Sequence, residues 1–326
     1  MSKRILIIRP DKIGDLILTL PMATALKNSD PDTQVLFLVQ EYTAPLARLC
    51  SDIDEVIIYN RNSSLRETIA QLRDAKPDAI FVLGHKLKLT LASFLAGIPV
   101  RAGRAYFWFS FLYNKKIFEH RKTAERNEAE FNIRMLCAME INDSNTPLPK
   151  LDKSKLPVNP IPVSDYIVFH IPTGGSAPSW SEEHYTNLSS WISQNFSSAI
   201  VLTGLPSDNS RLLGIAERMK HNSHNVHINT ESNLLELASL LASARLVISG
   251  STGPGHIASA LGTPTIGLFP GVTALSKERW GFRGEKIINL STLNYPQKDC
   301  PECRNCNCID EITELQVQEA ITLLKI

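Results

Sequence analysis

Short runs of β-branched and other apolar residues alternate along the chain with stretches whose apolar positions recur at helical spacing. In the first half, strands are predicted at Arg4–Arg9, Gln34–Gln40, Glu55–Asn60 and Asp78–Gly84. Helices are predicted between and after them, for example at Leu16–Lys27, Leu65–Asp74 and about Ala124–Met139. Strands that alternate with helices of this length predict βαβ units and a parallel sheet.

A second series of the same kind fills the C-terminal half. Its strands are predicted at Tyr166–Ile171, Ala199–Thr203, Asn225–Ile228, Leu246–Ser249, Thr265–Phe269 and near Lys286–Leu290. A last helix is predicted at about Glu311–Leu324, with its apolar residues near one face: Ile312, Leu315, Val317, Ala320, Ile321 and Leu324.

A proline-rich stretch separates the two series. Five of the nineteen prolines fall within Ile141–Asp165, where they disfavour both helix and central strand. The length of 326 residues also exceeds the roughly 250–300 at which a single core stops growing. We therefore expect an N-terminal domain over 1–150, a linker over 151–165 and a C-terminal domain over 166–326, whose last helix can pack back on the N-terminal domain. Two doubly wound domains would leave a cleft, with ligands beyond the carboxyl ends of the strands.

Composition narrows the function classes. The chain carries 34 Lys and Arg against 33 Asp and Glu, a net charge of +1, which argues against non-specific binding of nucleic acid. No run of about 18 uncharged apolar residues is present, so no membrane span is predicted. The N-terminus has no pattern typical of an export signal, so a cytoplasmic protein is expected.

The first strand runs into a loop that ends at Asp15, in the first turn of a helix. A carboxylate at this junction can accept a proton from a hydroxyl nucleophile, as a general base does. The alternative is that Asp15 only caps the helix, a position that aspartate favours. The dinucleotide fingerprint G-x-G-x-x-G is absent from the chain, which disfavours hydride transfer.

Two junctions of the second domain are suited to phosphate. The first predicted strand there leads into Thr173-Gly174-Gly175-Ser176, which offers hydroxyls and open backbone N–H groups; an ordinary glycine turn is an equal alternative. The strand at Leu246–Ser249 leads into Ser251-Thr252-Gly253 and a helix whose first turn holds His256. A helix N-terminus attracts anions, although a lone histidine is usually a core or surface residue. Two such loops in one domain fit a diphosphate and hence a nucleotide-sugar.

An aromatic and basic segment lies in the first domain. Residues 106–118 hold seven of the 23 aromatic residues, and the surrounding basic residues are Arg101, Arg104, Lys115, Lys116, Arg121, Lys122 and Arg126, against Glu119 and Glu125. Such a segment can lie on an anionic membrane or hold a phosphorylated, lipid-linked acceptor. It can also stack on single-stranded nucleic acid, or be a buried aromatic strand followed by a solvated basic helix.

Two further groups carry weaker signals. Cys300, Cys303, Cys306 and Cys308 could supply four thiolates to a structural zinc, but reduced structural thiols are the favoured interpretation. His221, His224 and His227 form an HxxHxxH pattern that is best explained as a solvated turn.

Several motifs together resemble glycosyltransferase family 9, the heptosyltransferases that add heptose from ADP-heptose to the lipopolysaccharide inner core. The opening motif is Ile8–Pro21 (IRPDKIGDLILTLP), and the donor-loop motif is Ser249–Pro264 (SGSTGPGHIASALGTP). Phe111–Lys116 (FLYNKK) and Cys300–Ile312 before the last helix also resemble family features. Two positions differ from the well-studied members: Ser179 replaces a lysine before Trp180, and Ser251 replaces an aspartate that is often present.

The resemblance implies an α/β protein of the GT-B fold and an inverting, single-displacement transfer of heptose. It implies Asp15 as the general base and Thr173, Thr252, Gly253 and His256 as donor-diphosphate residues. It places Arg61, Lys115 and Lys116 in acceptor-binding regions. The donor would be ADP-heptose, with no required cofactor, and the acceptor the inner-core oligosaccharide on lipid A. We expect a monomer in peripheral contact with the inner face of the membrane and without a nucleic-acid partner.

Two alternative functions also fit the sequence. One is a nucleotide-sugar epimerase on the same two-domain plan, which the basic aromatic segment disfavours. The other is a non-catalytic protein that binds a sugar-nucleotide or lipid, which the differences at Ser179 and Ser251 favour.

Overall fold

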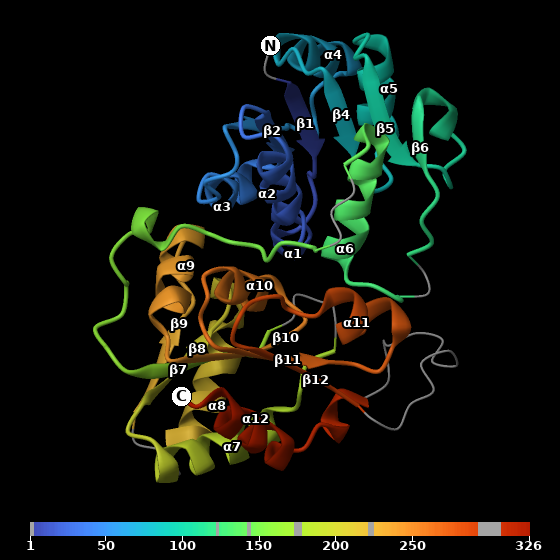
Figure 1. Cartoon of the computed structure of the whole chain (residues 1–326). Coiled ribbons are helices and arrows are strands. Elements are labelled where there is room, and N and C mark those ends of the chain that lie inside the picture. The colour runs from blue at the N-terminus through green and yellow to red at the C-terminus, as the bar shows by residue number, and fades with distance from the viewer. Residues whose placement is uncertain (1–2, 122–123, 142–144, 173–177, 221–224, 293–307) are drawn as a thin grey trace. The chain divides into compact units, whose positions relative to one another are not determined.

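The computed structural model describes residues 3–121, 124–141, 145–172, 178–220, 225–292 and 308–326, which form two compact units (Figure 1). The first unit comprises Met1–Arg121 and Glu128–Asp152, and the second comprises Lys122–Asn127 and Lys153–Ile326. The division after Asp152 falls inside the proline-rich stretch. Asn127, in the short segment that belongs to the second unit, donates through its side-chain amide to the carbonyl of Gly281 at 3.0 Å.

The first unit is built on a six-stranded parallel sheet in the order β3-β2-β1-β4-β5-β6. Its strands are β1 (Arg4–Ile8), β2 (Gln34–Val39), β3 (Glu55–Ile58), β4 (Ala79–Val82), β5 (Val100–Arg104) and β6 (Lys115–Ile117). The central strands read as unbroken apolar runs because helices cover both faces of a doubly wound sheet. In this order the topological switch point, where successive strands begin to be added on the other side of β1, lies between β1 and β4.

The helices of the first unit are α1 (Ile13–Ile17), α2 (Leu20–Ser29), α3 (Ala44–Ala47), α4 (Leu65–Asp74), α5 (Leu87–Leu95) and α6 (Glu128–Ile133), with 3₁₀ turns η1 (Glu41–Thr43), η2 (Ser110–Leu112) and η3 (Arg134–Met139). The single helix predicted at Leu16–Lys27 is wrong. Pro21 lies in the first turn of α2, where its missing N–H costs nothing but where it cannot continue α1.

Two other features of the first unit differ from the sequence prediction. The helix expected at about Ala124–Met139 is shorter, because Ala124 has a left-handed φ of 51° and the chain tightens to a 3₁₀ turn from Arg134. Strands β5 and β6 were not predicted. Both lack an apolar run: β5 contains two arginines and a glycine, and β6 begins with two exposed lysines at the sheet edge.

The second unit repeats the architecture, with strand order β12-β11-β10-β7-β8-β9. Its parallel strands are β7 (Tyr166–His170), β8 (Ala199–Thr203), β9 (Val226–Asn229), β10 (Leu246–Gly250), β11 (Thr265–Phe269) and β12 (Ile287–Ser291). All six predicted strands are therefore confirmed within one or two residues at their ends. The topological switch point of this sheet lies between β7 and β10.

The helices of the second unit are α7 (Glu182–Asn195), α8 (Asn209–Lys220), α9 (Leu234–Ser243), α10 (Gly253–Ala260), α11 (Lys277–Trp280) and α12 (Glu314–Leu324), with 3₁₀ turns η4 (Lys153–Lys155), η5 (Pro206–Asp208), η6 (Thr273–Leu275) and η7 (Cys308–Glu311). None of the helices within the described ranges is long and apolar enough to cross a membrane.

The last helix joins the core of its own unit. Val317, Ala320 and Ile321 are buried in the second core, together with Ile312 just before the helix, whereas Leu315 is exposed. The indole N–H of Trp180 donates to the carbonyl of Ile312 at 2.7 Å and fixes this C-terminal segment beside α7. Within the second unit, α12 packs on α7, β11 and β12.

Candidate functional site

In the first unit, the loops after β1 and β4 meet at the topological switch point of the sheet. The loop after β1 carries Asp11, and the loop after β4 carries Gly84 and Lys86. The ammonium of Lys86 contacts the Asp11 carboxylate at 2.5 Å. Gly84 turns the chain there with φ of 80°, in the left-handed region that favours glycine. Open α/β sheets bind ligands at such crevices, so this edge is a candidate site.

A buried ion network surrounds the end of β1. The Arg9 guanidinium, only 3% exposed, donates to the Asp15 carboxylate and lies 3.5 Å from Glu128 and 3.6 Å from Asp11. Arg121 pairs with the same Glu128 carboxylate. Buried charges need partners of opposite sign, and this network supplies them, although Nε of Arg9 and Nε and Nη2 of Arg121 have no hydrogen-bond partner among the described residues. The arrangement joins the Asp15 carboxylate to a buried partner just after the end of β1.

The carboxyl of Asp15 is suited to accept a proton. Burial raises its pKa above the ordinary value; Asp11 and Glu128 add to the rise, while Arg9 and the backbone N–H of Lys12 oppose it. A carboxylate with a raised pKa is a stronger base than a free aspartate. The hydrogen bond from the backbone N–H of Lys12, the N-cap of α1, shows that Asp15 also caps the start of this helix.

A basic cavity lies beside this network. It has a volume of about 280 Å³ and is lined by Pro10, Tyr59, Arg61, Lys86, Leu87, Lys88 and Leu89. The Arg61 guanidinium donates to the Pro10 carbonyl at 3.2 Å, and the Lys88 ammonium donates to the Arg61 carbonyl at 3.2 Å. Three cations around one cavity suit an anionic ligand. The resemblance implied acceptor binding for Arg61. Its hydrogen bond to Pro10 places it beside the loop that leads from β1 to Asp15. The sequence analysis did not identify Lys86 and Lys88 as candidates. They lie at the start of α5, and in the sequence they look like ordinary surface lysines.

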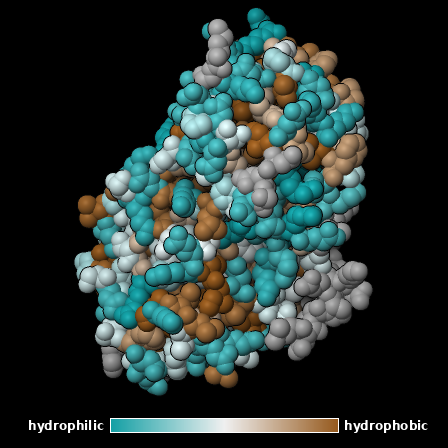
Figure 2. Space-filling view, viewed as in Figure 1, coloured by the Kyte–Doolittle hydropathy of each residue, from teal (hydrophilic) through white to brown (hydrophobic). Residues whose placement is uncertain are grey.

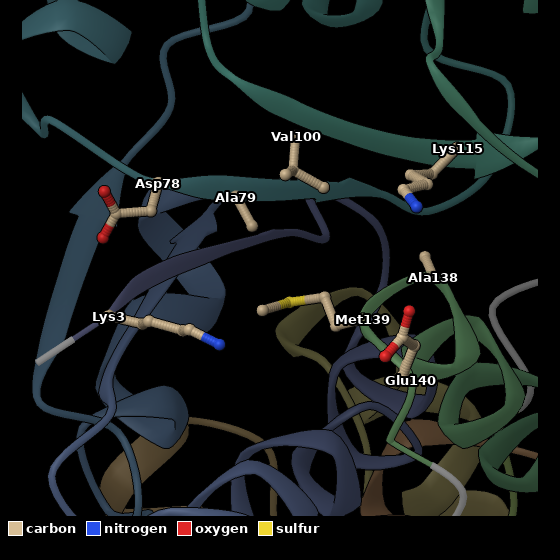
Figure 3. A pocket seen from close by; sticks show the side chains of 8 residues that line it. All are labelled: Lys3, Asp78, Ala79, Val100, Lys115, Ala138, Met139 and Glu140. Carbon is tan, nitrogen blue, oxygen red and sulfur yellow. The ribbon is translucent and has the colours of Figure 1, made fainter.

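The structure does not bring Lys115 to the same place. Lys115 lines a different cavity of about 460 Å³ together with Lys3, Asp78, Ala79, Val100, Ala138, Met139 and Glu140 (Figure 3). Those residues lie at or near the amino ends of the strands, whereas Asp15 follows the carboxyl end of β1. By register Lys115 lies level with Ile7 of β1, but strands β4 and β5 lie between β6 and β1, so Lys115 is separated from Asp15 across the sheet. Lys116, the next residue of β6, is exposed at the sheet edge.

In the second unit, the loop after β10 leads into α10 as predicted. Thr252 is the N-cap of α10, and its hydroxyl forms a hydrogen bond of 2.8 Å with that of Ser249 at the strand end. The helix starts with Gly253 and Pro254, so its first turn presents few side-chain atoms. Ser251, Thr252 and Gly253 therefore lie at a helix N-terminus where backbone donors and the helix dipole favour an anion.

His256 of this loop is buried and neutral. Its side chain is 3% exposed, and its ring packs edge-on against Phe282, with ring centroids 4.8 Å apart. Burial lowers the pKa of His256 to about 3, so the ring carries no charge at neutral pH. Nδ1 has no hydrogen-bond partner among the described residues. Any role of His256 toward an anion is therefore that of a neutral hydrogen-bond donor.

His170 is a candidate that sequence reasoning missed. It is the last residue of β7, in register between Ser249 of β10 and Thr203 of β8, and its Nδ1 lies 2.9 Å from the Thr203 hydroxyl. Burial lowers the pKa of His170 to about 4, against the opposing effect of Asp208. The sequence did contain a signal for His170: it is a polar residue at the end of a buried apolar strand, two residues before Pro172.

Several predicted residues lie outside the described parts of the chain. These are the donor-loop candidates Thr173, Gly174, Gly175 and Ser176, the cysteines Cys300, Cys303 and Cys306, and the histidines His221 and His224. Cys308 is described and is buried in η7. Among the described residues, no group of three or more His, Cys, Asp and Glu side chains is placed to hold a metal ion.

Ser179, which stands where a lysine was expected, has a structural role. Its hydroxyl donates to the carbonyl of Ile171 at 2.8 Å and lies 3.1 Å from the carbonyl of Trp180. It therefore links the end of β7 to the segment that precedes α7. No cationic side chain occupies this position.

Comparison with known proteins relates these features to a family. Residues 65–308 match the profile of glycosyltransferase family 9 (heptosyltransferase). A putative glycosyltransferase of Haemophilus influenzae is 30% identical over 300 residues, which is 85% of each chain. A glycosyl transferase of family 9 from Veillonella parvula has a similar structure, with a TM-score of 0.82, 20% identity, and coverage of 99% of this chain and 98% of that one.

A second solved structure, the ADP-heptose lipopolysaccharide heptosyltransferase II of E. coli, gives a TM-score of 0.76 at 20% identity, with coverage of 99% of this chain and 98% of that one. At this identity the likeness concerns the fold. Together with the two doubly wound sheets, it confirms the expected α/β architecture of the GT-B class.

Proposed function

The chain belongs to glycosyltransferase family 9 and is a glycosyltransferase, and we propose that it moves heptose from ADP-heptose to an acceptor sugar of the lipopolysaccharide inner core. The name of the similar E. coli enzyme supports this choice of donor and acceptor. The motifs Ile8–Pro21 and Ser249–Pro264 support it further, since both resemble family motifs and both lie at the carboxyl ends of parallel strands.

The observation that carries the proposal is the Asp15 carboxylate, held by buried Arg9 and with a raised pKa. In the proposed step, Asp15 takes the proton of the acceptor hydroxyl while the hydroxyl oxygen forms a bond to the anomeric carbon of the donor. The bond from that carbon to the diphosphate oxygen breaks, and its electron pair leaves with the nucleoside diphosphate. A single displacement of this kind inverts the anomeric centre.

The donor diphosphate is proposed to bind at the second-unit loop. The N-terminus of α10, with Ser251, Thr252 and Gly253, supplies backbone donors where negative charge develops on the leaving group. Neutral His256 adds a hydrogen-bond donor from within the same helix turn. Thr173, Gly174, Gly175 and Ser176 are proposed as the second phosphate loop, from the sequence pattern.

The acceptor is proposed to bind at the basic cavity of the first unit. Arg61, Lys86 and Lys88 surround a space that suits a phosphorylated sugar. Lys115 and Lys116 stay predictions from the resemblance. Both lie on β6, at the sheet edge opposite to β3 and Arg61, so an acceptor that contacted them as well would have to extend across the sheet. The proposed location is the cytoplasm, at the inner face of the membrane, and the proposed state is a monomer.

One assay separates the proposal from its rivals. The purified full chain is incubated with ADP-heptose and an inner-core acceptor that lacks heptose, and products are identified by mass spectrometry. The proposal predicts an acceptor heavier by one heptose, with ADP released in equal amount. An isomerised donor would indicate an epimerase, and donor binding without turnover would indicate a binding protein; either result contradicts the proposal.

A further inference from the structure

One segment of the first unit exposes three large aromatic side chains, which we call the aromatic ridge. Trp108, Phe111 and Phe118 are 73%, 68% and 73% exposed, which makes them the most exposed aromatic side chains among the described residues. All three fall in the segment around β6, the edge strand of the sheet. Figure 2 shows hydrophobic residues gathered along the margin of the first unit where β5 and β6 lie in Figure 1.

Buried neighbours hold this ridge in place. Phe109 is fully buried, and Tyr113 is 2% exposed, with its hydroxyl 2.7 Å from that of Thr90. The Tyr113 ring fills the space over Gly103, where a Cβ atom would lie 2.2 Å from the ring. Arg101 donates to the Leu112 carbonyl at 3.1 Å. The outward aromatic residues are therefore presented by an ordered platform, not left exposed by a loose loop.

The charges around the ridge are of one sign. Residues 100–118 contain four basic residues, Arg101, Arg104, Lys115 and Lys116, and no acidic one. The next acidic residue, Glu119, is nearly buried and paired with Arg134. Exposed aromatic rings beside lysines and arginines are typical of the interface of an anionic bilayer, where rings enter the headgroup region and cations remain at the phosphates.

The ridge is connected to the Asp15 junction within the same unit. Phe107 and Phe109 pack edge-on against His85, with ring centroids 4.7 Å and 4.9 Å apart. His85 lies in the loop after β4, next to Lys86, which pairs with Asp11. A partner that bound to the ridge would therefore lie near the loops that carry the proposed base.

Other occupants fit less well. A second copy that paired strand to strand along β6 would bring Lys115 and Lys116 against their own copies, and lysines on an edge strand oppose such pairing. Single-stranded nucleic acid usually requires a long positively charged groove, but the chain as a whole carries a charge of only +1.

We propose that residues 106–118 dock the protein on an anionic lipid bilayer, with Trp108, Phe111 and Phe118 inserted among the headgroups and Lys115 and Lys116 at the lipid phosphates. The inference rests on the proposed function only in explaining why the surface exists: a lipid-linked acceptor has to be reached at a bilayer. Vesicle binding requires no turnover, so it is tested separately from catalysis.

The test is cosedimentation of the full chain with vesicles of phosphatidylglycerol and phosphatidylethanolamine, and with phosphatidylcholine vesicles. The triple variant Trp108→Ser/Phe111→Ser/Phe118→Ser is expected to weaken binding to the anionic vesicles at least about tenfold. Lys115→Gln/Lys116→Gln is expected to weaken it by about tenfold or more, and to reduce its salt dependence. The matched control Leu213→Ser/Leu315→Ser/Leu323→Ser removes exposed apolar residues of the second unit and should bind like the wild type.

Tryptophan fluorescence gives a second readout that does not depend on the folding of the triple variant. The chain has four tryptophans, and Trp108 is the exposed one on the ridge. Anionic vesicles are expected to shift the emission to shorter wavelength and to protect it from iodide, and Trp108→Phe is expected to abolish the shift. Absence of wild-type binding, equal binding by the triple variant, conversion of a dimer to a monomer by that variant, or binding of a single-stranded oligonucleotide in place of vesicles would each overturn the proposal.

Discussion

The guanidinium of Arg9 donates to the carboxylate of Asp15 across the first turn after β1. Arg9 is buried, while the Asp15 side chain is 22% exposed, just after the carboxyl end of β1. The pair therefore combines a fixed cation with a carboxylate that a ligand can reach. Arg9 lowers the pKa of Asp15 and burial raises it, with a net rise. The balance sets the pH at which the proposed base ionises.

Removing the charge of Arg9 should change the pH profile of the reaction. In Arg9→Gln the pKa of Asp15 rises further, because the opposing coulombic effect is lost. Since the base works only when ionised, the acid limb of kcat against pH moves to higher pH. The free energy of unfolding should fall by about 3–5 kcal/mol, because buried carboxylates lose a partner. Denaturant unfolding and a pH–rate profile measure the two effects.

Arg9→Lys is the matched control for this prediction. It retains the positive charge but not the planar fork that reaches Asp15, Asp11 and Glu128 together. The acid limb should stay closer to that of the wild type, while stability still falls. An unchanged acid limb in a folded Arg9→Gln protein would show that the group limiting the rate at low pH is not Asp15.

Arg61 should affect acceptor binding and leave donor binding unchanged. Its guanidinium lines the basic cavity and is fixed to the Pro10 carbonyl. In Arg61→Gln, the loss of a charge-assisted hydrogen bond to a phosphorylated acceptor should raise the acceptor KM about tenfold. Steady-state kinetics with each substrate varied in turn test this. Arg66→Gln, an exposed arginine of α4 outside the cavity, should change neither KM; an Arg61 variant that raises only the donor KM would place the acceptor elsewhere.

Buried His256 should make the protein less stable at mildly acidic pH. Its pKa is about 3 when folded, below the ordinary value of 6.5, so the unfolded chain binds a proton that the folded chain does not. This contribution to stability is complete above pH 6.5 and is lost as pH falls toward 3. Between pH 7 and pH 5 it amounts to about 2 kcal/mol. Denaturant unfolding at the two pH values measures it.

The His256→Gln variant should lose about that much of the pH dependence. His227→Gln, which replaces a partly exposed histidine of β9, serves as the control and should retain the wild-type dependence. A His256→Gln protein with the same pH dependence as the wild type would show that the ring is charged or hydrated in the folded protein.

The fold was largely predictable because its strands are continuous apolar runs. Strands such as Gln34–Val39 and Ala199–Thr203 are buried on both faces, so their apolar residues follow one another without alternation. Strand β6 escaped prediction because a short edge strand with two lysines carries no such signal. Pro21 could have predicted the break between α1 and α2. The sequence analysis gave one helix there because the helical spacing of apolar residues continues across the break.

The candidate site was only partly predictable. Asp15 and the Thr252–His256 loop follow strand ends, a position that sequence alone identifies. Neither the burial of His256 under Phe282 nor its neutral state could be predicted, since Phe282 is 26 residues away and contacts it only in the folded protein. The separation of Lys115 from Arg61 could likewise not be predicted, because it depends on the strand order, which puts β3, before Arg61, and β6 at opposite edges of the sheet.

The most direct test of the account is the turnover of Asp15→Asn beside Asp11→Asn in the heptose-transfer assay. Both carboxylates contact Arg9, and each change removes one charge at nearly constant volume, so the two variants share the structural cost. We predict that Asp15→Asn lowers kcat by about 10²–10⁴-fold while donor binding persists, and that Asp11→Asn stays within about tenfold of the wild type. A folded Asp15→Asn protein that keeps more than about a tenth of the wild-type kcat would contradict the assignment of Asp15 as the base.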